Sequence, residues 1–511
     1  MFRKYPIGLQ NFEYLREEGY LYIDKTPIIH QLVTTGQMYF LTRPRCFGKS
    51  LLCSTIESLF KGSKHLFEGL WIYDKWDWTK TYSVIHLDFS QMVTEPTGFK
   101  ASICERLERY AMKWGITLTQ TNYMMQFREL IVKAGAKNGV VVLFDAYDSP
   151  ITDFLENSDK IAANQEILEN LYRVLKGAHH YIRFLLITGI TPLNQGAYES
   201  SISHLDNITL TSHYGAIAGF TEREVEENFK QEIDALRKQT PKILEHIKGW
   251  YYGFTWNMQI WVYNPFSILS FMRDRKFHCY WVLTGNTFIL PKRIKAQNVY
   301  DLEGIRLGSC GVKSFNAVDP SIGSLLYQTG YLTIKAVSEY WCLFDLGLPN
   351  KEIKLGLLTG LLNLYRDYNT QDATILIAAI RTALHERDLK EFMELLNKLI
   401  APISNEHWKK NSTFLFTATT VLAFQLLSAY LDTEVHNPNR SSEVIVIVKT
   451  DLYIYGIQLE LDHAATEEAL RLINDKGYLR PYQADQRLKI TIGIAFSSKD
   501  RQVIEYLTQE Q

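Results

Sequence analysis

The chain has 511 residues, of which 55 are basic and 56 are acidic, and 46% are hydrophobic. This composition excludes a disordered chain and is typical of a soluble globular protein with two to four domains and a large core. The balanced charge argues against a dominant nucleic-acid surface, which usually carries net positive charge, but it leaves a local basic groove open.

No segment predicts export or membrane insertion. The first twenty residues contain no apolar stretch of signal-peptide length, and the longest apolar segment, 417–431, is too short for a bilayer. The cysteines form no C-x-x-C pair, so we predict mostly buried, reduced thiols. We therefore expect a cytoplasmic protein without membrane contact. The six cysteines are Cys46, Cys53, Cys104, Cys279, Cys310 and Cys342.

Short apolar runs alternate with amphipathic stretches up to about residue 230. This alternation predicts an α/β domain with a mostly parallel sheet. Helical patterns occupy 50–60 and 99–114, and Thr221 with Glu224 forms a capping box that predicts a helix start. The predicted strands are 38–42, 83–89, 140–145, 182–188 and 215–220.

The remaining chain changes character twice. An aromatic-rich part of mixed pattern is followed by a helical part from 351 to 432, and the tail predicts strands again. Within the tail we predict two strands in 443–461 joined by a turn at 449–452, a short helix at 466–478 and a third strand at 488–497. The predicted domains are 1–230 (nucleotide-binding α/β), 231–350 (mixed α+β, lid or winged-helix-like), 351–410 (helical connector) and 411–511 (α/β).

The segment "YFLTRPRCFGKSLLCSTI" places Gly48, Lys49 and Ser50 between a predicted strand and a predicted helix. In this order, backbone N–H groups at a helix N-terminus bind phosphates, the lysine reaches the terminal phosphates and the hydroxyl binds Mg²⁺. Arg43 stands where G-x-x-x-x-G-K-S has its first glycine, so an ordinary strand–turn–helix remains the alternative. The pattern predicts ATP and Mg²⁺ as cofactors.

Two further predicted strands end in polar residues, Asp145 and Thr188. Because ligands of open α/β sheets bind at the carboxyl ends of the strands, we expect both side chains near Ser50. Asp145 would then hold Mg²⁺ with Ser50, and Thr188 would sense the terminal phosphate. The alternative for Asp145 is a structural cap of its strand.

Motifs along nearly the whole chain resemble one family. They include "PIGLQNFEYLREEGYLYIDKT", "LTRPRCFGKSLL", "LFDAYDSP", "IRFLLITGIT", "GFTEREVEENF", "WYYGF", "VYNPFSIL", "LLYQTGYLTIK" and "EEALRLINDKGY". The chain resembles bacterial AAA-ATPase-like proteins with a C-terminal PD-(D/E)XK nuclease-like domain. The resemblance implies a P-loop NTPase domain and a restriction-endonuclease-like α/β domain at 411–511. The family loop reads approximately R-P-R-R-F-G-K-S, so Arg43 and Arg45 join the predicted nucleotide-binding residues, and Cys46 replaces an arginine.

The family strand that corresponds to 140–145 typically ends D-E-Y-D, and Ala146 occupies the position of the water-activating Glu. A general base contributes ~10²–10⁴-fold in rate, so we predict nucleotide binding with impaired hydrolysis. Asp148 is the nearest candidate substitute for catalysis. Its alternative role is to cap the turn before Pro150.

The resemblance places the first acid of the nuclease motif at Glu443 and the E-x-K at 458–460. There Gln458 replaces an acid, and Glu460 replaces the lysine that orients water. A family glutamine on the next helix falls at Leu472. Glu443 remains a candidate metal ligand. The alternatives are a solvated strand face without chemistry, or a rearranged metal site of Glu443, Glu460 and Asp462.

The sequence therefore favours an ATP-binding protein with weak hydrolysis and an inactive nuclease-like tail. It would act as a nucleotide-dependent binding or regulatory module. The main alternative is an ATP-gated, metal-dependent DNA nuclease, and a third is that both sites are remnants. A DNA or protein partner is expected in the first two cases, and the sequence identifies neither the partner nor the oligomeric state.

Overall fold

The protein is described from a computed structural model. It describes residues 3–192, 205–284, 289–338, 340, 342–367, 372–437, 443–462, 470, 471, 473 and 476–510. The chain divides into two compact units, one of residues 1–281 and 304–349 and one of residues 282–303 and 350–511. The four predicted domains divide the chain more finely, and their boundaries stay a prediction. Among the described helices, none is long and apolar enough to cross a membrane.

A five-stranded parallel sheet forms the centre of the first unit, with the order β2-β3-β4-β1-β5. Every residue of β1 and of β3 is buried, as expected for strands covered on both faces. Four predicted strands and the parallel α/β class are thereby confirmed. The strands are β1 (Met38–Thr42), β2 (Ser83–Asp88), β3 (Val140–Asp145), β4 (Ile182–Gly189) and β5 (Asp206–Asn207).

The predicted strand at 215–220 is wrong. The segment forms turns and bends, apart from a single bridge between Phe220 and Tyr263. Gly219 has a φ of 89°, a left-handed conformation that glycine accepts without a steric penalty, and its N–H donates to the Phe47 carbonyl. The fifth strand comes instead from the two residues of β5.

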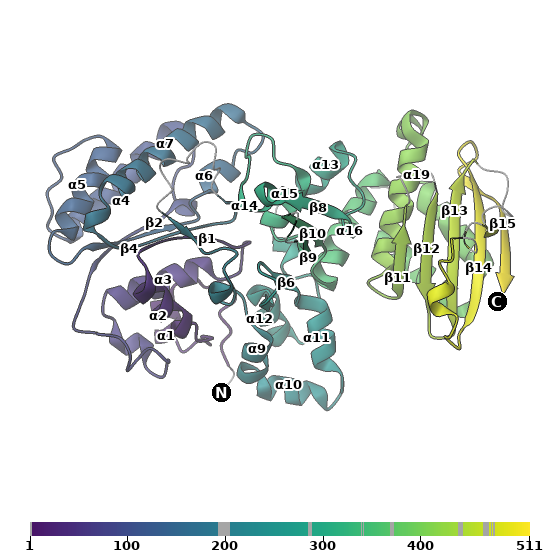
Figure 1. Ribbon diagram of the computed structural model, residues 1–511, viewed down its shortest axis with the longest axis horizontal. Helices are drawn as coiled ribbons and strands as arrows, with labels where there is room; N and C mark the ends of the chain where they lie inside the picture. Colours follow the sequence, from purple (N-terminus) through teal and green to yellow (C-terminus); the bar gives the residue numbers. More distant parts are fainter. Residues whose placement is uncertain are drawn as a thin grey trace. The chain divides into compact units, whose positions relative to one another are not determined.

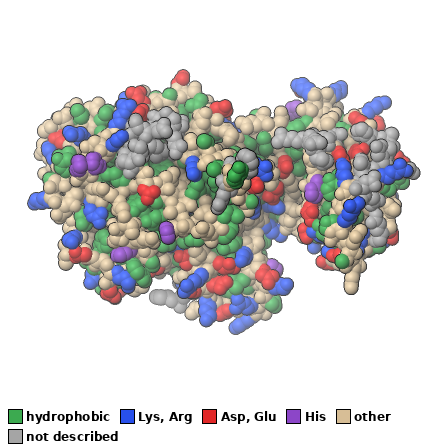
Figure 2. Space-filling model, in the orientation of Figure 1, with side chains coloured by type: hydrophobic (Ala, Val, Ile, Leu, Met, Phe, Trp, Pro, Cys, Tyr) green, Lys and Arg blue, Asp and Glu red, His purple; other side chains and the backbone are tan. Residues whose placement is uncertain are grey.

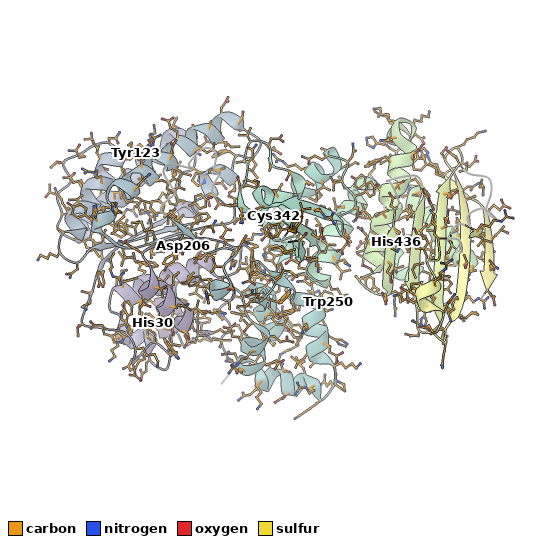
Figure 3. All side chains as sticks on the ribbon, viewed as in Figure 1. His30, Tyr123, Asp206, Trp250, Cys342 and His436 are labelled. Atoms are coloured by element: carbon orange, nitrogen blue, oxygen red, sulfur yellow. The ribbon has the colours of Figure 1, made fainter. Side chains whose placement is uncertain are left out.

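Helices cover both faces of this sheet (Figure 1), with α4, α5 and α7 on one side and α1, α2 and α3 on the other. Figure 3 shows Tyr123, at the start of α5, and His30, on α2, on opposite sides of the sheet. The buried residues of α7 recur at three- and four-residue spacing, the pattern of a helix with one apolar face. The helices are α1 (Phe12–Glu17), α2 (Thr26–Thr35), α3 (Lys49–Phe60), α4 (Pro96–Lys113), α5 (Tyr123–Gly135), α6 (Ser149–Thr152) and α7 (Ser158–Gly177).

The rest of the first unit is mixed. The predicted capping box of Thr221 and Glu224 is confirmed at the start of α9. Aromatic residues pack against one another in this part, with Phe277 stacked on Trp250 and Phe271. Figure 2 shows positive and negative side chains together over α10 and α11. The elements are α9 (Glu222–Asn228), α10 (Lys230–Arg237), α11 (Ile243–Tyr251), β6 (Phe254–Thr255), β7 (Trp261–Val262), α12 (Pro265–Asp274), β8 (Ile305–Gly308), α14 (Ser309–Lys313), α15 (Ile322–Gln328), β9 (Thr333–Ser338) and β10 (Leu343–Gly347).

The second unit combines helices with a five-stranded mixed sheet of order β11-β12-β13-β14-β15. Only the β13–β14 pair is parallel within this described sheet. The three predicted strands are confirmed, β11 and β15 were not predicted, and most of the predicted helix at 466–478 lies outside the described residues. The elements are α13 (Ile289–Ala296), α16 (Lys351–Tyr365), α17 (Ala373–Glu386), α18 (Leu389–Ile400), α19 (Asn405–Leu427), β11 (Asp432–His436), β12 (Val444–Lys449), β13 (Tyr453–Leu461), β14 (Leu488–Ser497) and β15 (Gln502–Glu510).

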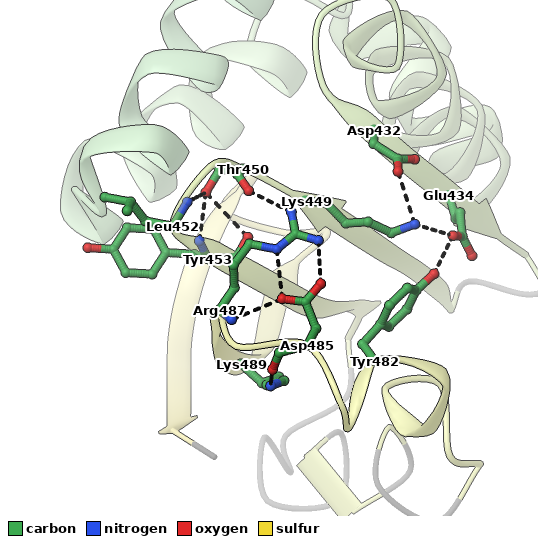
Figure 4. Close-up of polar contacts among 10 residues, drawn as sticks. All are labelled: Asp432, Glu434, Lys449, Thr450, Leu452, Tyr453, Tyr482, Asp485, Arg487 and Lys489. Atoms are coloured by element: carbon green, nitrogen blue, oxygen red, sulfur yellow. Dashed lines mark hydrogen bonds and ion pairs between the residues drawn. The ribbon is translucent and has the colours of Figure 1, made fainter.

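Polar side chains hold the turn between β12 and β13 (Figure 4). Lys449 Nζ lies 3.1 Å from Asp432 Oδ2 and 2.9 Å from Glu434 Oε1. Arg487 donates to the Thr450 carbonyl at 2.8 Å, and the Tyr453 N–H donates to Thr450 Oγ1 at 2.9 Å. The bonds of Arg487 and Tyr453 satisfy backbone groups of the turn predicted at 449–452.

Candidate nucleotide-binding site

The loop between β1 and α3 forms one wall of a cavity of about 380 Å³ in the first unit. Two loop residues have left-handed backbone, Cys46 with a φ of 63° and Gly48 with a φ of 98°. α3 begins at Lys49, so its N-terminal N–H groups lie at the end of the loop. Other walls of the cavity come from the N-terminal segment 6–10, from 217–220 and from the start of α12.

Lys49 is buried beside the loop. Its Nζ donates to the Arg43 carbonyl at 2.8 Å and to the Pro44 carbonyl at 2.9 Å. Burial lowers the pKa of Lys49, whereas the charges of Asp145 and Asp148 act to raise it. An ammonium group has three donors, so a third remains for an anionic ligand in the cavity.

Asp145 and Thr188 lie on adjacent strands at the carboxyl edge of the sheet. Thr188 Oγ1 donates to Asp145 Oδ1 at 2.7 Å, and both side chains are buried. Asp145 and Ser50 line the cavity, whereas Thr188 does not. Asp145 therefore lines the same cavity as the loop, as expected. Thr188 lies behind Asp145, where its hydroxyl can orient the carboxylate. The sensing role predicted for Thr188 stays a prediction.

The two arginines of the loop lie in different places. Arg45 lines the cavity. Arg43 does not, because its guanidinium packs over the Trp256 ring at 4.0 Å and donates to the Thr209 carbonyl at 2.9 Å. Burial lowers the pKa of Arg43 to about 9. These contacts hold Arg43 at the start of the loop, and the nucleotide-binding role predicted for it stays a prediction.

Ala146 lines the cavity directly after Asp145 and has a φ of 50°. Its methyl group offers no atom that accepts a proton. The position predicted to activate water therefore lines the cavity, but with a side chain that has no acid–base chemistry.

Asp148 anchors the loop that follows β4. Its carboxylate accepts from the Ile190 N–H at 3.0 Å, the Thr191 N–H at 2.7 Å and Thr191 Oγ1 at 2.8 Å. Burial raises the pKa of Asp148, and the bonds from Thr191 act against that rise. Asp148 is the N-cap residue of α6, but its side chain makes no capping bond there, so the proposed capping of the turn before Pro150 is wrong for the side chain.

The predicted residues of the C-terminal sheet are engaged with neighbours. Glu443 Oε1 lies 2.9 Å from Lys476 Nζ, and Gln458 Nε2 donates to Glu460 Oε1 at 2.6 Å. Asp462 accepts from the Ser498 N–H at 2.7 Å. In the described part of the chain, Glu443, Glu460 and Asp462 do not converge as a metal-binding group.

The expectation of a solvated face on β13 is wrong, because Gly456 and Gln458 are buried. A Cβ added at Gly456 would meet the side chains of Leu479 and Ile473 at 3.2 Å and 3.4 Å, so these residues cover the face. Leu472, where the family glutamine was expected, lies outside the described residues.

Sequence reasoning missed the walls that lie far from the loop along the chain. Gly8, Leu21, Ile217 and Phe266 line the cavity without belonging to any nucleotide-binding motif. Lys25 also lines it, and its Nζ lies 2.7 Å from Glu224, the residue of the capping box. The spacing of these residues in the sequence does not predict that they line a cavity, because only folding of the unit brings them together.

A parallel sheet whose first strand leads into a G-K-S loop, with an aspartate at the same edge, defines a P-loop-like nucleotide-binding domain. Residues 6–197 match the family described as Predicted AAA-ATPase. A protein of Azotobacter chroococcum mcd 1, described as "Uncharacterized protein in vnfD 5'region", is 30% identical over 522 residues, which cover 99% of each chain. The present chain belongs to the family of that protein and carries a predicted AAA-ATPase-like domain. No solved structure matches the chain.

Proposed function

We propose that this protein binds ATP together with Mg²⁺ in the cavity beside the loop. The observation that carries the proposal is that Gly48, Lys49, Ser50 and Asp145 line one cavity at the carboxyl edge of the sheet. Its volume of about 380 Å³ lies within the range of small-molecule sites, ~300–1,000 Å³. When bound, Mg²⁺ would neutralise phosphate charge, and Ser50 and Asp145 are the oxygen ligands offered to it.

The walls fit a nucleotide in polarity as well. The loop offers Lys49 and the N–H groups at the start of α3, which suit phosphates. Other lining residues contribute apolar side chains, among them Leu21, Ile23 and Phe266, which suit a flat base. The cavity therefore combines anion-binding groups with an apolar lining.

Hydrolysis by this protein would be slow. Ala146 supplies no base, and the carboxylate of Asp148 already accepts three hydrogen bonds at its anchor. A missing general base costs ~10²–10⁴-fold in rate, whereas the groups proposed to hold the nucleotide remain. Long-lived binding rather than turnover is the function that these residues favour.

The cavity walls also suggest how binding would act on the rest of the unit. Residues 6–10, the loop and α12 are distant in sequence but border the same cavity. A ligand that contacts all three would stabilise their packing, because a ligand stabilises the state that binds it. We therefore propose a nucleotide-dependent binding or regulatory module, whose partner would be a protein or DNA.

The C-terminal sheet would contribute no nuclease activity. Lys476 neutralises Glu443, and its hydrogen bond with Glu443 raises the pKa of Lys476. Gln458 is buried and its Nε2 donates to Glu460, and its neutral amide oxygen is a poorer metal ligand than the carboxylate that the motif requires. A PD-(D/E)XK site needs two carboxylates on a metal and a lysine beside water, and these contacts supply neither.

Calorimetric titration with ATP, with and without Mg²⁺, tests the proposal. The wild type should bind ATP more tightly with Mg²⁺, and Ser50→Ala should lose most of that enhancement. Ser158→Ala, an exposed serine at the start of α7, is the matched control and should behave as the wild type. Absence of binding by the wild type, or the same Mg²⁺ dependence in Ser50→Ala, would contradict it.

A further inference from the structure

A second group of polar side chains lies between α3 and the sheet. Cys53, His86 and Asp145 place one ligand atom each within 4.8 Å of one another. Cys53 lies one turn after Lys49 on α3, His86 lies on β2, and Asp145 ends β3. In the β2–β3 register His86 pairs with Leu143 and Asp88 pairs with Asp145. His86 and Asp145 therefore belong to the same face of the sheet, the face that α3 covers.

The two nitrogens of His86 have different surroundings. Nδ1 lies 2.8 Å from Glu57 Oε2. Nε2 is buried and has no hydrogen-bond partner among the described residues. A buried nitrogen without a partner costs free energy, so its position beside a thiol and a carboxylate calls for a ligand. The contact of Nδ1 with a carboxylate is the arrangement that orients metal-binding histidines in proteins.

We propose that Cys53 Sγ, His86 Nε2 and an Asp145 oxygen bind one transition-metal ion with the preferences of Zn²⁺. A thiolate, an imidazole and a carboxylate are ligands that Zn²⁺ accepts together, whereas Mg²⁺ and Ca²⁺ prefer oxygen ligands alone. Bond lengths of ~2.0–2.3 Å place tetrahedral ligands closer to one another than 4.8 Å. A small movement of the three side chains would thus complete the site, with a fourth position for water.

Charge and access are compatible with an ion at this position. Binding releases the Cys53 proton, since the thiolate is the ligand, and the thiolate and Asp145 together balance a divalent charge. Glu57 keeps its own partner, Lys61, at 2.5 Å. The His86 side chain is 16% exposed, and Asp145 borders the nucleotide cavity, so the site has a route from solvent.

The site stands apart from the proposed ATP function, because Cys53 and His86 do not line the nucleotide cavity. Asp145 is the one residue that the two proposals share. A titration without nucleotide therefore tests the metal site alone, and its failure would leave ATP binding unaffected.

Co²⁺ is the probe, because a Co²⁺–thiolate bond gives a charge-transfer absorption band that reports the sulfur ligand. The metal-free full chain should bind one equivalent of Co²⁺ with this band, and Zn²⁺, which binds more tightly, should abolish it. Cys53→Ser and His86→Gln should lose the band, and Cys104→Ser, a cysteine on α4, should keep it. Glu57→Gln should weaken Co²⁺ binding ~10–100-fold, the usual effect of removing the partner of a metal-binding histidine, and Glu105→Gln on α4 should not.

Circular dichroism of each metal-free variant distinguishes loss of the ligand from loss of the fold. If Cys53→Ser does not fold, the wild-type spectrum and the Cys104→Ser control decide the matter. A wild type without a thiolate band, a band that survives in folded Cys53→Ser, or a band lost in folded Cys104→Ser would overturn the proposal.

Discussion

Two substitutions of Ala146 distinguish the effect of its backbone conformation from the effect of its missing carboxylate. Ala146 has a φ of 50° and lines the cavity after Asp145. A left-handed conformation costs an L-residue about 1–2 kcal/mol, which Ala and Glu pay alike because both have a Cβ. Ala146→Glu should therefore change the free energy of unfolding by only about 0.5 kcal/mol. Ala146→Gly removes the Cβ and with it the cost of the left-handed conformation. Glycine also has greater entropy in the unfolded chain, which offsets part of this gain, so the folded protein should be more stable by about 0.5–1 kcal/mol.

The two variants should differ in turnover. Ala146→Glu supplies a carboxylate where the wild type has a methyl group, so ATP hydrolysis should rise by ~10²–10⁴-fold with little change in ATP affinity. Ala146→Gly adds no base and should hydrolyse ATP as slowly as the wild type. Phosphate release under saturating ATP and urea unfolding of each variant measure both quantities. Turnover of folded, ATP-bound Ala146→Glu at the wild-type level would refute the reasoning, and another defect in the loop would then limit hydrolysis.

Three further predictions concern Asp148, Asp367 and the C-terminal sheet. Asp148→Ala should lower the free energy of unfolding by about 1–3 kcal/mol, because the Ile190 and Thr191 N–H groups and the Thr191 hydroxyl would lose the carboxylate oxygen that accepts from all three; urea unfolding measures this loss, and an unchanged midpoint would contradict it. Burial raises the pKa of Asp367, but hydrogen bonds from Ser404 and His407 outweigh it and keep the pKa below its ordinary value. The carboxylate therefore stabilises the fold above the unfolded pKa, about 3.9, and this contribution disappears as pH falls through the lower, folded pKa. Asp367→Asn should thus be less stable than the wild type near pH 7 by about 1.5–3 kcal/mol, and the difference should shrink on acidification; a constant difference would exclude this origin. Plasmid DNA with Mg²⁺ or Mn²⁺ should remain uncut by the wild type, and cutting that Glu443→Ala abolishes would show a working nuclease.

Strands buried on both faces were predictable, because a short continuous apolar run is the pattern typical of a buried strand in a parallel sheet. β3 has the predicted bounds, Val140–Asp145. The helical pattern over 373–400 was equally clear, but it does not reveal that Arg387, with a φ of 59°, ends α17 before Asp388 caps α18. β15 escaped prediction because most of its residues are exposed, so no apolar pattern marks this strand at the edge of the sheet.

The site was predictable only where a motif carries the chemistry. The order of Gly48, Lys49 and Ser50 places the loop, and strand ends place Asp145. The orientation of Arg43 depends on Trp256, a residue more than two hundred positions away in the chain, and local sequence does not encode such a contact. Cys53 and His86 carry no motif spacing at all, since a helix and a strand bring them together only in the folded sheet.

Thermal unfolding with and without ATP–Mg²⁺ tests the central claim, ATP binding at the loop, most directly. A ligand at about 100 times its Kd stabilises a protein by about 2.7 kcal/mol, so the wild type should show a clear rise in Tm. Lys113→Ala, an exposed lysine at the end of α4, should show the same rise, and Lys49→Ala should show none. An equal rise in Lys49→Ala and the wild type, or no rise in the wild type, would contradict the assignment of this loop as the nucleotide site.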